Sequence, residues 1–297
     1  MDRIGFVGLG LIGSPMCMNL VKAGYDVSIW NRTKSRIEPL LDAGAHSASS
    51  PKEVAAKSGI VITCVSDSPD VEQVILGPDG IIDGVNIDSV VIDMSTISPS
   101  VTKSIAERLA NKNVHMLDAP VSGGVNGAES GNLSIMVGGN SDILERCTPV
   151  LKVIGNSITH CGTNGMGQVT KLANQITGLG TMAAMCEGLV FAAKNGADLK
   201  AVLKAMAGGA ANSWMIENLG SAILDGHFEP GFMVKLAHKD LRLVLESATE
   251  SELPLLTTPL VTQIFRAATV AGHGNDGIQG YIKILEGLAD IEARSEE

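Results

Sequence analysis

A glycine-rich turn between a predicted strand and a predicted helix constrains the fold of this chain more than any other feature. Arg3-Ile-Gly-Phe-Val-Gly is typical of a short buried strand, and the amphipathic stretch after the turn runs to Lys22 before Ala23-Gly24 ends it. The turn itself reads Gly8-Leu9-Gly10-Leu11-Ile12-Gly13. A G-x-G-x-x-G pattern is weak evidence alone, and it becomes informative in this strand–turn–helix context.

Each glycine of this turn has a separate physical role. Gly8 allows the tight turn, Gly10 lets the backbone approach a pyrophosphate, and Gly13 lets the helix pack closely on the sheet. The helix that follows presents unpaired N–H groups and the positive end of its dipole to a phosphate. The residues from Gly8 to Gly13 therefore predict a dinucleotide-binding site. The alternative is a close-packed turn that holds no ligand.

The first half of the chain alternates predicted strands with predicted helices. Further strands are predicted over residues 26–31, 60–65, 90–95, 114–120 and 133–139, and a helix over 34–42. Such alternation builds βαβ units and a largely parallel sheet. We therefore expect an α/β fold in which residues 1–163 form a Rossmann-type, doubly wound dinucleotide-binding domain.

Helical periodicity takes over after residue 163. A long helix is predicted from Gly165 to a stop near Asn195-Gly196, and further helices over 199–207, 214–224, 236–251, 259–271 and 278–293. A chain of 297 residues is long enough for two domains. We expect residues 164–297 to comprise this long interdomain helix and an all-α C-terminal domain.

The long helix carries an isolated charge. Lys171 and Asn174 are three residues apart and therefore share one helical face, and no other charged residue follows until Glu187. Burial would disfavour the ammonium form and lower the pKa of Lys171, which suits a residue that transfers protons near neutral pH. The alternative is a lysine whose stem packs against the protein while its amine reaches water.

The residues after the second predicted strand bear on the choice of cofactor. An NAD site usually places Asp or Glu there, where it accepts a hydrogen bond from a ribose hydroxyl. This chain instead has Asn31-Arg32-Thr33-Lys34. An arginine can bind a 2′-phosphate through paired hydrogen bonds, and no carboxylate in this segment repels it. The segment favours NADP(H) over NAD(H), against the alternative of a solvated helix start with incidental positive charge.

Asp118-Ala-Pro-Val-Ser122-Gly123-Gly124 lies at the carboxyl end of a predicted strand, where open α/β sheets bind ligands. Ser122 offers a hydroxyl, and Gly123 and Gly124 expose backbone N–H groups that suit a substrate carboxylate. A plain glycine-rich turn explains this segment equally well. Ser95-Thr96, after another strand, offers a hydroxyl on the side where a nicotinamide would lie.

Composition excludes some classes of function. The net charge of −10 argues against broad binding to the phosphate backbone of nucleic acid. Five cysteines without Cys-x-x-Cys spacing favour a reducing cytoplasm, and six dispersed histidines form no metal-ligand pattern. The chain enters a strand pattern at once, without a signal peptide, and the uncharged interval 172–186 is too short and polar for a membrane span. By composition alone, Lys239-Asp240 is an ordinary surface pair.

Four motifs occur along the chain: the N-terminal glycine turn, Asp118-Ala-Pro-Val-Ser-Gly-Gly, Gly167-Gln-Val-Thr-Lys-Leu-Ala-Asn-Gln and Lys239-Asp240. In this order they resemble the β-hydroxyacid dehydrogenases, the family of 3-hydroxyisobutyrate dehydrogenase and tartronate semialdehyde reductase. The resemblance covers essentially all residues. It implies a nucleotide-binding domain joined by a long helix to a helical domain, usually in homodimers or homotetramers.

The resemblance also implies a role for each motif residue. Lys171 would be the catalytic residue, with Asn174 as its hydrogen-bonding neighbour in contact with substrate. The substrate would further contact Ser122, Gly123, Gly124, Trp214, Phe232 and Lys239. The cofactor would contact Gly8, Leu9, Gly10, Leu11, Ile12, Gly13, Asn31, Arg32, Thr33, Val65, Thr96 and Lys239.

The activity that the resemblance implies is reversible hydride transfer between NADP(H) and a small β-hydroxy acid or semialdehyde acid, of the tartronate semialdehyde, 3-hydroxyisobutyrate or succinic semialdehyde class. The segment 208–214 contains no Arg, so the resemblance does not extend to subfamilies that bind a second carboxylate through an arginine there. Two alternatives remain open. One is a non-catalytic NADP-binding module, against which the presence of Lys171 counts. The other is an imine reductase, in which another residue is expected at this position.

Overall fold

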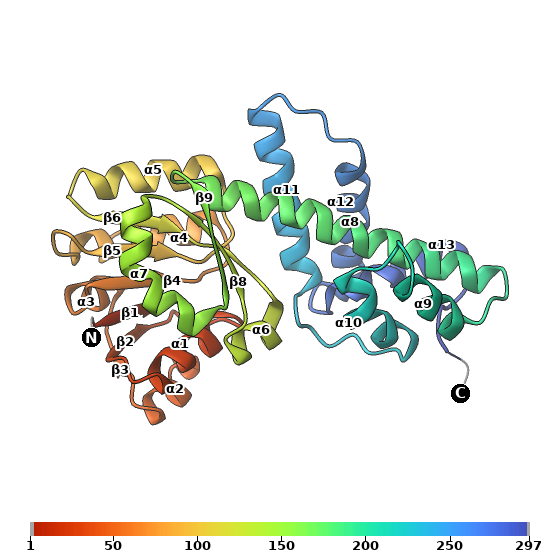
Figure 1. The fold of residues 1–297 in the computed structure, drawn as a ribbon, viewed down its shortest axis with the longest axis horizontal. Helices are drawn as coiled ribbons and strands as arrows, with labels where there is room; N and C mark the ends of the chain where they lie inside the picture. Colours follow the sequence, from red (N-terminus) through yellow and green to blue (C-terminus); the bar gives the residue numbers. More distant parts are fainter. Residues whose placement is uncertain (1–2, 296–297) are drawn as a thin grey trace. The chain divides into compact units, whose positions relative to one another are not determined.

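The computed structural model describes residues 3–295 and contains two compact units, Met1–Lys171 and Leu172–Glu297 (Figure 1). The first unit contains the sheet and the second is helical, which confirms the predicted fold class. The boundary between the two units falls inside the long helix, whereas the sequence analysis placed the domain boundary before that helix, between residues 163 and 164. The reason is that the first turn of the helix is bonded to the sheet, where Asp118 accepts hydrogen bonds from the backbone of Gly165 and Gln168.

A mixed sheet forms the centre of the first unit. Its strands are β1 (Ile4–Val7), β2 (Val27–Trp30), β3 (His46–Ser47), β4 (Ile60–Thr63), β5 (Val90–Asp93), β6 (His115–Asp118), β7 (Val121–Ser122), β8 (Ser134–Gly138) and β9 (Ser157–Gly162). The strand order is β3-β2-β1-β4-β5-β6-β8-β7, with β9 on β8. The strands from β3 to β6 pair in parallel, whereas β8 runs antiparallel to β6 and β7. Every residue of β1, β4 and β5 is buried, as expected of strands covered on both faces.

Helices cover the two faces of this sheet in separate groups (Figure 1). Phe6 and Val7 are neighbours on β1, so their side chains point to opposite faces. The core around Phe6 is completed by α1 (Gly13–Lys22), α2 (Glu38–Asp42), α6 (Gly124–Ser130) and α7 (Ser141–Ile154). The core around Val7 is completed by α3 (Pro51–Ala56), α4 (Ser68–Leu76), the 3-10 helix η2 (Ile81–Asp83) and α5 (Pro99–Ala110). This arrangement is the doubly wound fold that the strand and helix alternation predicted.

The helix predicted over residues 34–42 is divided in two. A 3-10 helix, η1 (Lys34–Arg36), is followed after Ile37 by the short α2. Pro39 stands at the start of α2, where its missing N–H group is tolerated, but a proline ring clashes with the preceding turn of a continuous helix. The single predicted helix was therefore wrong in detail, and Pro39 is the cause.

The strand order contains a switch point between β1 and β4. From β1 the chain passes to β2 and β3 on one side, and it then returns to β4 on the other side of β1. The turns that follow β1 and β4 therefore diverge at the carboxyl edge of the sheet. Crevices at such switch points are where open α/β sheets bind their ligands.

The second unit is built from helices. Its elements are the greater part of α8 (Met166–Lys194), then α9 (Leu199–Ala207), α10 (Trp214–Leu224), α11 (Val234–Glu250), α12 (Thr257–Ala268), the π-helical segment η3 (Thr269–His273), the 3-10 helix η4 (Ile278–Tyr281) and α13 (Ile282–Ala289). Its core includes Met182 of α8, Leu241 of α11 and Phe265 of α12.

Two of the helical predictions in the second unit were too long. The helix predicted over 259–271 ends at Ala268, and Gly272 in the following segment has a φ of 95° that an α-helix cannot contain. The helix predicted over 278–293 ends at Ala289, since Asp290 adopts a left-handed conformation with a φ of 50°. The predictions over 199–207 and 214–224 match α9 and α10.

Among the described residues 3–295, α8 is long and apolar enough to cross a membrane by length and composition alone. It has 29 residues, and 44% of its most apolar window is buried within the protein. This is weak evidence for a membrane span, because the core helix of a soluble domain has the same properties. Met182, Cys186 and Leu189 of α8 are fully buried in the core of the second unit.

Candidate active site

The glycine turn after β1 has the geometry of a ligand-binding loop. Gly8 has a φ of 102°, and a Cβ atom there would lie 2.3 Å from the carbonyl oxygen of Cys64. A Cβ atom on Gly13 would lie 2.1 Å from the carbonyl oxygen of Gly8. At Gly10, by contrast, the nearest atom to a Cβ would be Arg36 Nη1 at 3.9 Å. Gly8 and Gly13 are therefore required by the fold, whereas the backbone at Gly10 is open on its Cβ side, as the close approach of a pyrophosphate requires.

Asn31 connects this turn to the end of β2. Its side-chain oxygen accepts a hydrogen bond from Leu9 N (2.9 Å), and its amide nitrogen donates to the Thr33 carbonyl (2.8 Å). Arg32 is exposed, and its Nη1 lies 3.2 Å from Asp70 Oδ1 on α4. Arg32, the arginine that the sequence placed at the end of the second strand, therefore has the Asp70 carboxylate as its partner.

Arg36 is a second cation that the sequence reasoning missed. It ends η1, and its Nη1 donates to the carbonyl oxygen of Leu9 (3.4 Å), which places the guanidinium beside the glycine turn. The available signal was its position near the start of the helix predicted over 34–42, two residues after Lys34.

The ends of β4 and β5 are joined through buried polar groups. Ser95 is 2% exposed, and its hydroxyl accepts a hydrogen bond from Val65 N (2.9 Å). Asp93 Oδ1 accepts from the Thr63 hydroxyl (2.7 Å) and from Ser95 N (3.2 Å). Thr96, the next residue, is half-buried. Of Ser95 and Thr96, the two hydroxyl residues considered in the sequence analysis, Ser95 therefore uses its hydroxyl to join the ends of β4 and β5.

Asp93 is fully buried, and burial raises its pKa from 3.8 to about 6. Its hydrogen bonds from Ser95 and Thr63 oppose this shift, and the charge of Asp118 adds slightly to it. Within residues 3–295, its second oxygen has no hydrogen-bond partner. A proton on that oxygen removes the charge that is costly to bury.

The segment around Ser122 turns sharply after β7. Ser122 pairs with Ser134 of β8, and the two glycines that follow have φ values of 139° and 63°. Both values lie in the left-handed region, where a Cβ atom is strained, so Gly123 and Gly124 are required by the backbone. Gly124 then begins α6.

Lys171 lies in the second turn of α8 and is buried, with 6% of the residue exposed. This burial favours the proton-transfer interpretation of Lys171 over the alternative in which its amine reaches water. Asn174 follows one turn later. Its Nδ2 donates to Gln175 Oε1 (3.0 Å), and Gln175 Nε2 donates to Asp240 Oδ2 (2.6 Å).

Composition alone predicted that Lys239-Asp240 is an ordinary surface pair. The structure contradicts this prediction. Asp240 is 3% exposed, and its Oδ1 lies 2.8 Å from Lys239 Nζ. Through Gln175, this pair connects to Asn174 within the second unit.

The two aromatic residues that were predicted to contact substrate also belong to the second unit. Trp214 begins α10 and is 57% exposed, and Phe232 packs partly buried against the core around Met182.

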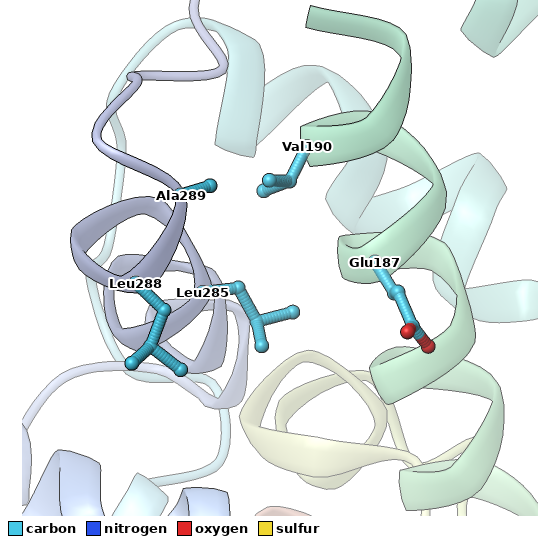
Figure 2. Close-up of a pocket in the computed structure, with 5 residues that line it drawn as sticks. All are labelled: Glu187, Val190, Leu285, Leu288 and Ala289. Atoms are coloured by element: carbon cyan, nitrogen blue, oxygen red, sulfur yellow. The ribbon is translucent and has the colours of Figure 1, made fainter. Parts of the chain in front are cut away.

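A shallow cavity of about 190 Å³ lies elsewhere in the second unit (Figure 2). Its lining consists of Glu187, Val190, Leu285, Leu288 and Ala289. Figure 2 shows Val190 of α8 pointing toward α13, which carries Leu285, Leu288 and Ala289, and Glu187 on the same helix α8. None of the predicted site residues lines it. Within residues 3–295, no group of three or more His, Cys, Asp or Glu side chains could hold a metal ion.

A doubly wound sheet with an open glycine turn at its switch point defines a dinucleotide-binding protein, here with a separate helical unit. Residues 3–162 match the NAD binding domain of 6-phosphogluconate dehydrogenase. Residues 165–285 match the NAD-binding model of NADP-dependent 3-hydroxyisobutyrate dehydrogenase. The chain belongs to the β-hydroxyacid dehydrogenase family, and it is an oxidoreductase that uses a nicotinamide dinucleotide.

Individual relatives match over nearly the whole chain. A probable 3-hydroxyisobutyrate dehydrogenase-like protein of Arabidopsis thaliana is 40% identical, over 99% of this chain and 88% of its own. The 2-hydroxy-3-oxopropionate reductase of Escherichia coli is 38% identical, over 97% and 98% of the two chains. The crystal structure of 3-hydroxyisobutyrate dehydrogenase from Salmonella typhimurium superimposes with a TM-score of 0.86 at 31% identity, covering 96% of this chain and 100% of that one.

These findings bear on the alternatives that the sequence left open. An imine reductase from Pseudomonas sp. shares the fold, with a TM-score of 0.63 at 24% identity, over 96% of this chain and 99% of its own. A likeness at that level concerns the fold alone. The dehydrogenase interpretation therefore fits better than the imine reductase or the non-catalytic module.

Proposed function

We propose that this enzyme interconverts a small β-hydroxy acid and the corresponding semialdehyde acid, with Lys171 as general acid and base. The nicotinamide dinucleotide, when bound, donates or accepts the hydride. The observation that carries the proposal is the burial of Lys171, 6% exposed in the second turn of α8. An amine held away from bulk water at a fixed position is suited to proton transfer.

The proposed roles follow the motifs residue by residue. Lys171 donates a proton to the substrate's carbonyl oxygen during reduction and removes it during oxidation. Asn174 orients that lysine and the oxygen, and Ser122, with the backbone N–H groups of Gly123 and Gly124, holds the substrate carboxylate. Both glycines have positive φ values, and successive N–H groups in such turns can form a concave site for an anion. Positioning the reactants in this way supplies much of the rate acceleration.

The remaining residues complete the proposed site. Trp214, Phe232 and Lys239 would contact the substrate, and Lys239 would also contact the cofactor. Leu9, Leu11 and Ile12, with the glycines of the same turn, would surround the pyrophosphate, and Asn31, Arg32 and Thr33 the adenosine ribose. Val65 and Thr96 would lie along the dinucleotide at the ends of β4 and β5.

The proposed substrate is a short acid of the tartronate semialdehyde, 3-hydroxyisobutyrate or succinic semialdehyde class. The relatives that carry names of this kind support it. The absence of arginine from residues 208–214 favours a substrate with one carboxylate over one with two.

We also propose that the enzyme prefers NADP(H) over NAD(H). Arg32 and Arg36 place two guanidinium groups at the end of β2 and beside the glycine turn. A 2′-phosphate carries close to two negative charges and competes with the single charge of Asp70 for Arg32. We therefore expect Asp70→Asn to raise the ratio of kcat/KM with NADPH to kcat/KM with NADH. A parent enzyme that favours NADH would contradict the proposal.

We further propose that the enzyme is a cytoplasmic homodimer or homotetramer. This rests on the family resemblance and on cysteine usage that is typical of a reducing compartment. Light scattering measures the molar mass of the purified protein in solution. The mass of a monomer at micromolar concentration would exclude both the homodimer and the homotetramer.

The function is tested with purified enzyme, both cofactors and a panel of β-hydroxy acids, semialdehyde acids and cyclic imines. We expect turnover of at least one β-hydroxy acid or semialdehyde acid, faster with the NADP(H) pair. Turnover of imines alone would point to an imine reductase. Stoichiometric cofactor binding without turnover of any compound would point to a non-catalytic module.

A further inference from the structure

The N-terminus of α8 is capped by a side chain from the sheet. Asp118, the last residue of β6, accepts hydrogen bonds from Gly165 N at Oδ1 (2.8 Å) and from Gln168 N at Oδ2 (3.0 Å). A helix usually satisfies its first free N–H groups with the side chain of the residue that precedes it. Here that residue is a glycine, so the carboxylate of Asp118 takes over this role from a distant part of the chain.

Gln168 extends the same connection to the end of β5. Its Nε2 donates to the Ser95 carbonyl (2.8 Å), and its Oε1 accepts from Ile97 N (3.1 Å). The two bonds bracket Thr96, the residue proposed to contact the cofactor. Gln168 is 0% exposed, so these bonds are shielded from water.

Glycines on both sides leave room for the Asp118 carboxylate. A Cβ atom on Gly138 would lie 2.6 Å from Asp118 Oδ1, and one on Gly167 would lie 2.8 Å from Asp118 Oδ2. The carboxylate therefore occupies a space that no larger neighbour permits. This close packing supports the hydrogen bonds that tie the start of α8 to the end of β6.

The residues that this network holds are the ones that carry the proposed chemistry. Lys171 follows Gln168 by one helical turn and shares its face of α8. Ser122 follows Asp118 after the short connection to β7. Asp118 and Gln168 thus fix the backbone that bears Lys171, Ser122 and Thr96 within the first unit.

We propose that Asp118 is a positioning residue, which sets the place of Lys171 by anchoring the first turn of α8 to the sheet. The inference rests on the proposed function of Lys171. Asp118 itself touches the helix backbone and takes no part in the proton transfer.

The experiment uses Asp118→Asn in the full-length enzyme. The amide keeps the shape of the carboxylate, but its NH2 group turns toward one of the two helix N–H groups and cannot accept from it. We expect a folded enzyme with cofactor Kd within about twofold of the parent, since the glycine turn is not involved. We expect kcat to fall by roughly tenfold or more, because displacement of a catalytic group by about 1 Å can cost up to 10²-fold.

Asn140→Ala is the matched control. Asn140 caps α7 and likewise accepts from two backbone N–H groups, those of Asp142 and Ile143. Loss of either cap costs stability of the same order. We expect Asn140→Ala to keep kcat within about twofold of the parent. Equal effects of the two variants on kcat would overturn the inference.

A double variant separates positioning from general destabilisation. If Asp118 acts through Lys171, adding Asp118→Asn to Lys171→Ala slows the enzyme little further. If the two losses multiply, Asp118 acts otherwise and the inference fails. Near-parental activity of Lys171→Ala itself would overturn the proposed function instead.

Gln168→Met provides a second route if Asp118→Asn does not fold. It removes the two side-chain bonds to the β5 end and leaves the backbone bond to Asp118 in place. We expect kcat to fall severalfold with a smaller change in cofactor Kd. An unchanged kcat in Gln168→Met would show that the network does not position the site.

Discussion

The protonation of Asp93 makes the stability of the first unit depend on pH in a way that one substitution can isolate. Its pKa is raised by burial from 3.8 to about 6. Between these values the folded protein binds a proton there and the unfolded chain does not, so the free energy of unfolding falls as pH rises. A shift of this size corresponds to about 3 kcal/mol over the whole interval, present below pH 4 and lost as pH rises through 6.

Asp93→Asn removes this titration while it keeps the size of the side chain. Other groups titrate in the parent and the variant alike, so the difference between the two free energies of unfolding reports Asp93. We expect the parent to lose about 2 kcal/mol relative to the variant between pH 4.5 and 7.5. Asp83→Asn provides the control for the same chemical change at an exposed position.

The assay is urea unfolding followed by tryptophan fluorescence. The chain has two tryptophans, and Trp30 belongs to the first unit and Trp214 to the second. A Trp214→Phe background therefore makes the signal report the unit that contains Asp93. A parent–variant difference that stays constant with pH, or that grows in favour of the parent as pH rises, would refute the reasoning.

Further predictions concern the proposed site and the cofactor turn. Lys171→Ala should fold and bind cofactor but lose roughly a hundredfold or more in kcat, as single-turnover rates would show. Arg32→Ala should lower the NADPH/NADH ratio of kcat/KM by roughly tenfold, and an unchanged ratio would exclude contact with the 2′-phosphate. Gly10→Ala should fold normally and weaken cofactor binding in calorimetry. Gly13→Ala should lower the thermal midpoint of the apo protein, because its Cβ would lie 2.1 Å from Gly8 O.

The parts of the fold that the sequence predicted are those with a local signal. The buried strands β1, β4 and β5 are continuous apolar runs, and the glycine turn is recognisable within a single strand–turn–helix segment. The edge strand β9 was not predicted. Its residues are half or fully exposed, so it has no hydrophobic run or alternation to reveal it.

The site was predictable where the chemistry lies in a motif and not where it depends on tertiary contacts. Asp118 bonds to residues 47 and 50 positions away, and nothing near it in the chain marks it as a helix cap. Asp240 looks like surface charge beside Lys239, but its buried carboxylate accepts a hydrogen bond from Gln175, 65 positions away. Such pairings follow from the folded topology, which sequence spacing does not contain.

Two buried carboxylates stand side by side in register at the ends of β5 and β6, and their surroundings differ. Burial raises the pKa of both, and at Asp118 the backbone N–H groups at the start of α8 oppose this rise without reversing it. Those groups and the positive end of the helix dipole stabilise a carboxylate. The charge of Asp118 is the smallest of the causes that raise the pKa of Asp93. We therefore expect the pH-dependent stability assigned to Asp93 to persist in Asp118→Asn, while kcat falls. The reason is that Asp93 titrates within the sheet, whereas Asp118 holds the helix that carries Lys171.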